Sequence, residues 1–287
     1  MNPPFIVAEM SANHLGDLAR AHRIIDAAAN ADAHAIKLQT FTPEQMVDAD
    51  KMIETGPWAG WKAIDLYRKA HTPREWHAEL FEHARNLGLV AFSSVFHPDD
   101  VAFLETLNCP IYKISSFENA DLTLIQRVAM TKKPVMLSTG MATEIVIQRA
   151  IDCLYKFGSY KVALLKCTSA YPAEAHEANL ATMVEMNGRW SYGAITPDVG
   201  LSDHTQGIGV AVAAVALGAT VIEKHLTLRR ADGGPDAAFS MEPEEFSQMS
   251  LECHRAAAAI GTVHYGPTPG EAASMLLRRK PGGKRGD

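Results

Sequence analysis

The chain has 287 residues and a mass of 31.2 kDa, with 47% hydrophobic and 21% charged residues, which fits a globular protein with a large core. A net charge of −6 and widely spread basic residues argue against a nucleic-acid surface. No apolar run approaches the ~20 residues of a membrane span, and no charged region followed by an apolar one stands at the start, so we expect no signal peptide. The four cysteines are far apart and lack metal-binding spacing, so we expect core thiols in a cytoplasmic protein.

Short apolar segments alternate with helical patterns in the first half of the chain. Asp17 is expected to cap one helix, and Thr72 to Glu75 has the pattern of a capping box that begins another. Between them, 42–71 is expected to be a long loop that carries Trp58 and Trp61. The expected strands are 5–10, 34–39, 89–93 and 111–114, and the expected helices are 18–30, 73–87, 99–107 and 121–131.

The alternation continues in the second half. Expected strands are 134–138, 162–167, 192–195 and 221–224, with 199–202 at the tip of the third of these, and expected helices are 143–157, 179–187, 207–218 and 242–260. Eight such units predict a parallel sheet closed into a (β/α)8 TIM barrel, a single domain over 1–275 followed by a disordered tail at 276–287. An open doubly wound sheet is the alternative, although no GxGxxG follows the first strand.

Two histidines follow neighbouring predicted strands near the end of the barrel. His204 is the last residue of the segment that begins at Val199, and His225 is the last residue of the segment that begins at Val221. Because the carboxyl ends of parallel strands meet at one edge, the two imidazoles should converge there. Such a pair suits a divalent metal with open positions that acts on a substrate oxygen, with Asp236 or water completing the shell.

The same edge should collect lysines, hydroxyls and carboxylates. Lys37, Lys113 and Lys224 are expected together on this rim, near several serines. Lysine supplies positive charge and hydroxyls supply directed donors, so the set suits an anion that carries both phosphate and carboxylate. The strand tips also hold Glu9, Asn13, His14, Gln39, Ser94, Ser116, Glu118, Ser138, Thr139, Lys166, Tyr171, Ser202 and Glu223.

Eight motifs, spread over nearly all of residues 5–260, resemble those of the sialic acid synthase (N-acetylneuraminate synthase) family of phosphoenolpyruvate-condensing barrels. They are Ala8-Glu-Met-Ser-Ala-Asn-His-Leu-Gly-Asp17, Ile36-Lys-Leu-Gln-Thr-Phe41, Tyr112-Lys-Ile-Ser-Ser-Phe-Glu118, Leu137-Ser-Thr-Gly-Met141, Leu165-Lys-Cys-Thr-Ser-Ala-Tyr-Pro172, Gly200-Leu-Ser-Asp-His204, Glu223-Lys-His225 and Gly234-Pro-Asp236.

The resemblance implies metal-dependent condensation of phosphoenolpyruvate with a sugar or sugar-like aldehyde, giving a 2-keto acid and phosphate. It implies that His204 and His225 bind Mn²⁺, with Mg²⁺ or Co²⁺ as other candidates. It also implies that Glu9 and Asp236 contact the aldehyde substrate and that Tyr171 walls its pocket. We further expect a homo-oligomer, a dimer. Phosphoenolpyruvate would be held by Lys37, Gln39, Ser94, Lys113, Ser116, Ser138 and Ser202.

Three features depart from the family pattern. Lys166 stands where a histidine is usual, and Ser94 where a Thr-Pro pair is usual. Members of the family also carry a C-terminal antifreeze-like domain that contacts the sugar's N-acyl group, and this chain stops near Arg278, where the linker to that domain would begin. We therefore expect the chain to lack that domain, and expect the segment around Trp58 and Trp61 to line or cover the acceptor pocket.

Two other functions are compatible with the residues alone. Lys166 ends a predicted barrel strand, where its amine could form a Schiff base in an aldolase. A non-catalytic sugar-binding subunit is the second, although such a protein would not need both histidines and the lysines together.

Overall fold

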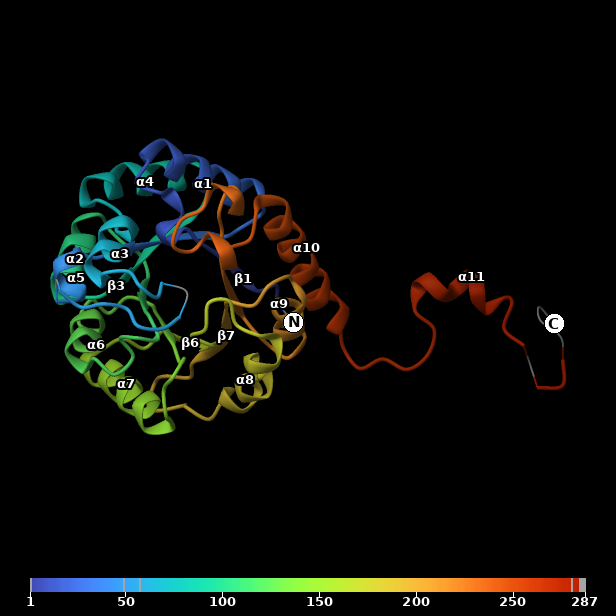
Figure 1. Cartoon of the computed structure of the whole chain (residues 1–287). Helices are drawn as coiled ribbons and strands as arrows, with labels where there is room; N and C mark the ends of the chain where they lie inside the picture. The colour runs from blue at the N-terminus through green and yellow to red at the C-terminus, as the bar shows by residue number, and fades with distance from the viewer. Residues whose placement is uncertain (1, 49, 57, 280, 284–287) are drawn as a thin grey trace.

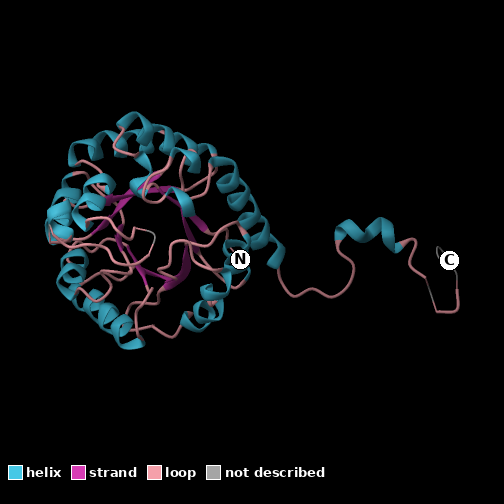
Figure 2. Ribbon diagram, viewed as in Figure 1, coloured by secondary structure: helices cyan, strands magenta, loops and turns pink. Residues whose placement is uncertain are grey.

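Eight parallel strands form a closed barrel in the order in which they occur in the chain, β1 to β8 (Figure 1). The structure is a computed structural model and describes residues 2–48, 50–56, 58–279 and 281–283. Figure 2 shows the strands as an inner ring inside an outer ring of helices. The strands are Phe5–Glu9, Ala35–Thr40, Val90–Val95, Tyr112–Ile114, Val135–Ser138, Val162–Cys167, Asp198–Asp203 and Val221–His225. The predicted (β/α)8 TIM barrel is confirmed.

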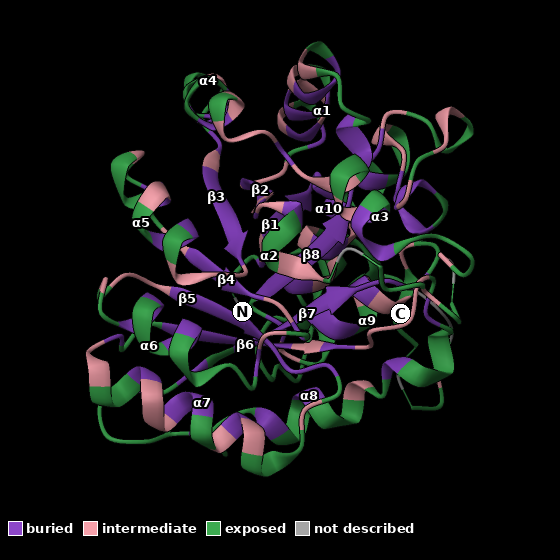
Figure 3. Cartoon of the chain, turned by 60° about the vertical axis from the view of Figure 1, so that its left-hand side comes forward, coloured by how far each residue is buried: buried purple, intermediate pink, exposed green. Residues whose placement is uncertain are grey.

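Apart from the short helices at 43–46, 63–70 and 272–275, the helices lie outside the barrel with their apolar faces against the strands (Figure 3). Asp17 caps α1 as predicted, because its carboxylate accepts a hydrogen bond from the backbone N–H of Arg20. The α-helices are α1 Leu18–Asn30, α2 Pro43–Met46, α3 Ala63–Ala70, α4 Arg74–Asn86, α5 Pro98–Thr106, α6 Leu122–Ala129, α7 Glu144–Phe157, α8 Leu180–Met186, α9 Gly209–Ala216, α10 Pro243–Ile260 and α11 Ala272–Met275. None of those in the described part of the chain is long and apolar enough to cross a membrane.

Three local predictions were wrong. The segment 42–71 is not a plain loop, because it contains α2 and α3. Thr72 does not cap α4, whose first turn follows Pro73 without a side-chain cap. The predicted strand at 192–195 is only an isolated antiparallel bridge, and 198–203 forms β7 instead. For 42–71 and Thr72, turn and cap residues were given more weight than the neighbouring apolar residues. The residues Tyr192 and Ile195 bridge one another and not a barrel strand.

Ser94 was expected at a tip but lies within β3, which runs two residues further than predicted. At the other end of the chain, α10 ends at Ile260 and the residues 261–279 are exposed and extend away from the barrel (Figure 1). The expected disordered tail at 276–287 includes residues 280 and 284–287, which lie outside the described residues.

Gly200 shows how tightly the barrel interior is filled. A Cβ at this position would lie 2.5 Å from the carbonyl oxygen of Val221 and 2.9 Å from Cδ2 of Leu165. The carbonyl belongs to β8 and cannot move without disturbing the barrel, so only glycine fits here.

We therefore predict that Gly200→Ala lowers the free energy of unfolding by about 1–3 kcal/mol, the usual cost of overpacking a core. Gly209→Ala is the matched control, because its Cβ would meet nothing within 4 Å. Chemical denaturation of both variants checks this. Equal stability of the two variants would contradict the packing argument.

Candidate functional site

The side chains at the carboxyl ends of the barrel strands form one inward-facing polar layer. Residues paired across neighbouring parallel strands point to the same face, and the register pairs Glu9 with Lys37 and Ser202 with Glu223. Following the pairs around the barrel shows which residues of the strands lie on the inner face. These inward residues are Glu9, Lys37, Gln39, Ser94, Lys113, Ser138, Cys167, Ser202, Glu223 and His225.

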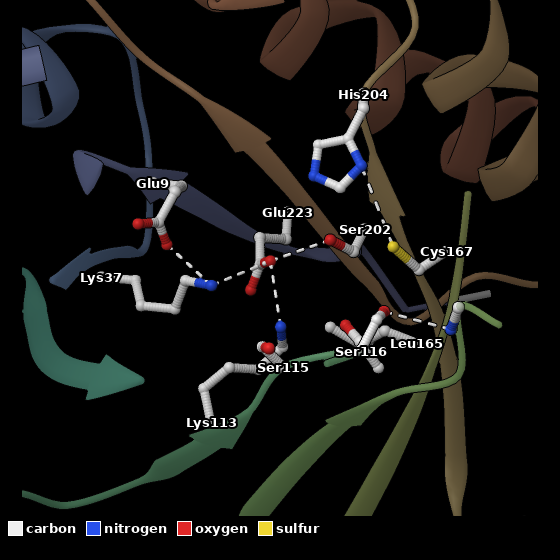
Figure 4. Close-up of polar contacts among 12 residues, drawn as sticks. Glu9, Lys37, Lys113, Ser115, Ser116, Leu165, Cys167, Ser202, His204 and Glu223 are labelled. Carbon is white, nitrogen blue, oxygen red and sulfur yellow. Dashed lines mark hydrogen bonds and ion pairs between the residues drawn. The ribbon is translucent and has the colours of Figure 1, made fainter. Parts of the chain in front are cut away.

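Glu223 lies at the centre of this layer (Figure 4). Its Oε1 is 3.0 Å from Nζ of Lys37 and 3.3 Å from Nζ of Lys113, and it accepts a hydrogen bond of 2.9 Å from Ser202. Lys37 also contacts Glu9 at 2.7 Å. All five side chains are buried, so two ammonium groups and two carboxylates balance each other in a space closed to bulk water.

The network shifts the protonation of its members. Burial alone would raise the pKa of Glu223, but Lys113 and Lys37 together hold the pKa well below its ordinary value. Burial lowers the pKa of Lys37 to about 7, against the opposing attraction of Glu223. The charge on Lys37 is therefore sensitive to any further anion that enters the layer.

His204 and His225 lie side by side above this network, with ring centroids 5.4 Å apart. Nδ1 of His204 is 2.9 Å from the carbonyl oxygen of Thr168, which leaves Nε2 available. Nδ1 of His225 is buried and has no hydrogen-bond partner, and burial holds the pKa of this histidine well below its ordinary value. Figure 4 also shows Cys167 beside His204, at 3.9 Å from Nδ1.

The two histidines fit a metal ion that takes two imidazole ligands and leaves its other positions to water or substrate. A buried imidazole nitrogen without a partner is the observation that supports this fit, because such atoms normally find one. Within the described residues, no group of three or more His, Cys, Asp and Glu side chains is arranged to hold an ion. Any third ligand from the protein would therefore require a side chain to move.

Asp236 and Tyr171, two of the three residues assigned to the aldehyde substrate, line a cavity of about 450 Å³ over the layer, whereas Glu9 does not line it. It is bounded by Gln39, Tyr171, His225 and Asp236. Asp236 accepts hydrogen bonds from the hydroxyl of Ser11 and from a backbone N–H, and burial raises its pKa. This inner cavity is within the size range of small-molecule sites.

Ser138 and Ser116 lie beside this layer. The hydroxyl of Ser138 is buried and has no hydrogen-bond partner, whereas Ser116 accepts one from the backbone N–H of Gly140 at 3.1 Å. Unpaired polar atoms also occur on Glu9, Glu223 and His225. Their concentration in one place is typical of a site that a polar ligand completes.

Two lysines that were expected at the rim lie outside the barrel interior. Lys224 faces the helices, where it pairs with Asp203 at 2.6 Å and is fully buried. The prediction that it joins Lys37 and Lys113 was therefore wrong. Lys166 also lies on the outer face, because its neighbour Cys167 points inward, and its amine donates to the carbonyl oxygen of Cys167. A Schiff base in the inner cavity has no support from this position.

Two inward residues had no assigned role in the sequence analysis. Glu223 was recognised only as a residue at a strand tip, and Cys167 only as a core thiol. Every second residue of a barrel strand points inward. Glu223 lies two residues before His225, and Cys167 lies two residues after Leu165, so this spacing could have identified both as inward residues. Burial would raise the pKa of Cys167, but the hydrogen bond with His204 lowers it to about 6.

We predict that Glu223→Gln lowers the free energy of unfolding at pH 7 by about 3–5 kcal/mol, because it leaves two buried ammonium groups with one carboxylate. The stabilisation from Glu223 is fully present above its ordinary pKa of 4.5 and is lost as the pH falls toward the lowered folded-state value. Denaturation at a series of pH values should show the difference from wild type shrinking below pH 4.5. A difference that does not depend on pH would contradict this reading.

The NeuB family model matches residues 24–265 of the chain. A pseudaminic acid synthase from Helicobacter pylori is 43% identical over 91% of this chain and 76% of its own length. An N,N'-diacetyllegionaminic acid synthase from Campylobacter jejuni is 34% identical, over 98% and 84%. The crystal structure of N-acetylneuraminic acid synthetase from Leptospira borgpetersenii, in complex with citrate, superposes with a TM-score of 0.85 and 32% identity, over 96% and 90%. The chain belongs to the NeuB family and, like these relatives, is an enzyme of the synthase class.

Proposed function

We propose that the protein condenses phosphoenolpyruvate with an aldehyde sugar to form a 2-keto acid and phosphate. The observation that carries this proposal is the pair of buried ammonium groups, Lys37 and Lys113, that share one carboxylate inside the barrel mouth. Two cations held this close together and closed to water are suited to a small, highly charged anion. Family membership supports the same reaction.

Lys37 and Lys113 would bind the phosphate and carboxylate of phosphoenolpyruvate. Entry of this anion raises the negative charge around Lys37, whose pKa of about 7 would then rise, and the ammonium form would persist at neutral pH. The hydroxyl of Ser138, which has no hydrogen-bond partner, would donate a hydrogen bond to the same ligand. Ser94, Ser116 and Ser202 would provide the rest of the polar wall.

The acceptor would occupy the cavity above. C3 of phosphoenolpyruvate forms a bond to the aldehyde carbon, whose oxygen becomes a hydroxyl on taking up a proton. Water adds to C2, and the C2–O bond to phosphate breaks, leaving a 2-keto acid and inorganic phosphate. Asp236 would orient the acceptor's hydroxyl groups, with Tyr171 as an apolar wall, and Glu9 would contact the acceptor from the polar layer below. The relatives named for pseudaminic and legionaminic acids support a sugar of that type.

His204 and His225 would hold the divalent ion, for which Mn²⁺ is our first choice and Mg²⁺ or Co²⁺ the others. Such an ion supplies Lewis-acid polarisation of a substrate oxygen when bound. The chain's own contribution is to present His225 in its neutral, ligand-competent form, because burial depresses its pKa. A homodimer in the cytoplasm remains our expectation for its state in the cell.

Lys113→Ala should weaken the binding of phosphoenolpyruvate at least about tenfold, since one charge-assisted contact contributes about 1.5–3 kcal/mol. Lys166→Ala is the matched control, because it removes an amine from the outer face of another barrel strand, β6. Isothermal titration calorimetry with phosphoenolpyruvate measures both. Loss of binding in the Lys166 variant alone would remove this assignment and revive the aldolase alternative.

Chelation should abolish phosphate release from phosphoenolpyruvate and an aldehyde, and added Mn²⁺ should restore it. Independently of turnover, His225→Ala should weaken Mn²⁺ binding, read by electron paramagnetic resonance of the free ion. His264→Ala, in the exposed segment 261–279 that extends away from the barrel, is the control. Full activity in chelator, or equal Mn²⁺ binding by the two variants, would exclude the metal from this site.

A further inference from the structure

A second and larger cavity, the outer cavity, lies next to the inner cavity. It has a volume of about 780 Å³, against about 450 Å³ for the inner cavity. Three of the chain's four tryptophans line it, namely Trp58, Trp61 and Trp76. This volume and these aromatic walls are typical of a small-molecule site that binds apolar groups.

The two cavities share a wall. Trp58, Tyr171, Pro235 and Phe239 line both of them. The ring of Tyr171 contacts Trp58 at 5.6 Å between centroids, and on its other side it contacts His204 at 4.5 Å. Only this layer of side chains therefore separates the histidines from the outer cavity.

Trp58 is joined to the rest of the wall by a hydrogen bond and by its contact with Tyr171. It lies in a small hairpin in which Met52 and Lys62 form an antiparallel bridge. Its indole N–H donates to the carbonyl oxygen of Pro235 at 3.0 Å, which joins the hairpin to the loop after β8. Tyr171 and Phe239, in contrast, pack on one another and on the histidines, so they cannot leave without disturbing the site.

We propose that the outer cavity is a second compartment of the acceptor site, which takes an apolar acyl-type substituent, and that Trp58 limits access to it. This inference rests on the proposed function for the identity of the acceptor. Flat aromatic faces favour an acyl chain, and Lys69, whose ammonium group lies 4.7 Å from the Trp61 ring centroid, can donate to an amide oxygen at the rim.

The proposal makes Trp58 a determinant of specificity. Replacing its indole by a methyl group removes the shared wall and joins the two cavities. The kcat/KM for acceptors with long acyl substituents should then rise relative to that for acceptors with short ones. The reason is that each added methylene can contact the apolar wall of the outer cavity, which the indole no longer blocks.

The test compares kcat/KM for aldehyde sugars with an N-hexanoyl and an N-acetyl group. Trp58→Ala should raise the hexanoyl-to-acetyl ratio at least about tenfold, and Trp58→Leu should raise it less. Trp58→Phe keeps a ring in the wall and should keep the wild-type ratio. Adding Trp61→Ala to Trp58→Ala should remove part of the gain, since Trp61 lines only the outer cavity.

A binding measurement separates this inference from the proposed function. The N-hexanoyl sugar alcohol lacks the aldehyde and cannot react, and its binding is followed by tryptophan fluorescence. One outcome is tighter binding of this alcohol by the Trp58→Ala or Trp58→Leu variant, with no phosphate release from phosphoenolpyruvate in the presence of any aldehyde. It would overturn the proposed reaction but support the outer cavity as a binding compartment. An unchanged ratio and unchanged alcohol binding in both variants, with active condensation, would overturn the compartment. A gain that survives Trp61→Ala in full would also overturn it.

Discussion

The site depends on one carboxylate, Glu223, held between two buried ammonium groups. Without Glu223, the buried Lys37 and Lys113 would have only the carboxylate of Glu9 to balance their two positive charges. Burying an unpaired charge costs several kcal/mol, so the lysines would lose their protons or turn away. Glu223 favours the charged form of Lys37 and holds both lysine side chains in place until an anion of higher charge enters.

The closed barrel makes this arrangement possible. Strict alternation along each strand sends one residue inward and the next toward the helices, and a closed sheet brings eight inward rows to one mouth. The same rule puts Glu223 inside and its neighbour Lys224 outside, where Lys224 pairs with Asp203. The chain thus holds two ion-pair systems of different use on opposite faces of β8: one open to a ligand and one that joins β8 to β7 and to the loop after β7.

Most of the fold and the inward residues could be predicted from the sequence, because apolar runs followed by polar tips identify parallel strands. The histidine pair followed from this pattern, and the structure places the two rings 5.4 Å apart. Lys224 was misplaced because the tips were grouped by position in the chain and not by the face they occupy. Trp58 could be assigned to a wall only in three dimensions, since its partner Pro235 lies far away in the sequence. The central role of Glu223 likewise depends on distances across the barrel.

A crystal structure of the protein with phosphoenolpyruvate bound tests the central claim most directly. The account predicts phosphate and carboxylate oxygens within hydrogen-bond distance of Nζ of Lys37 and Nζ of Lys113, with the hydroxyl of Ser138 paired to the ligand. Phosphoenolpyruvate bound at the exposed cations Arg68 and Lys69 of the outer cavity, with the Glu223 network undisturbed and empty, would contradict it.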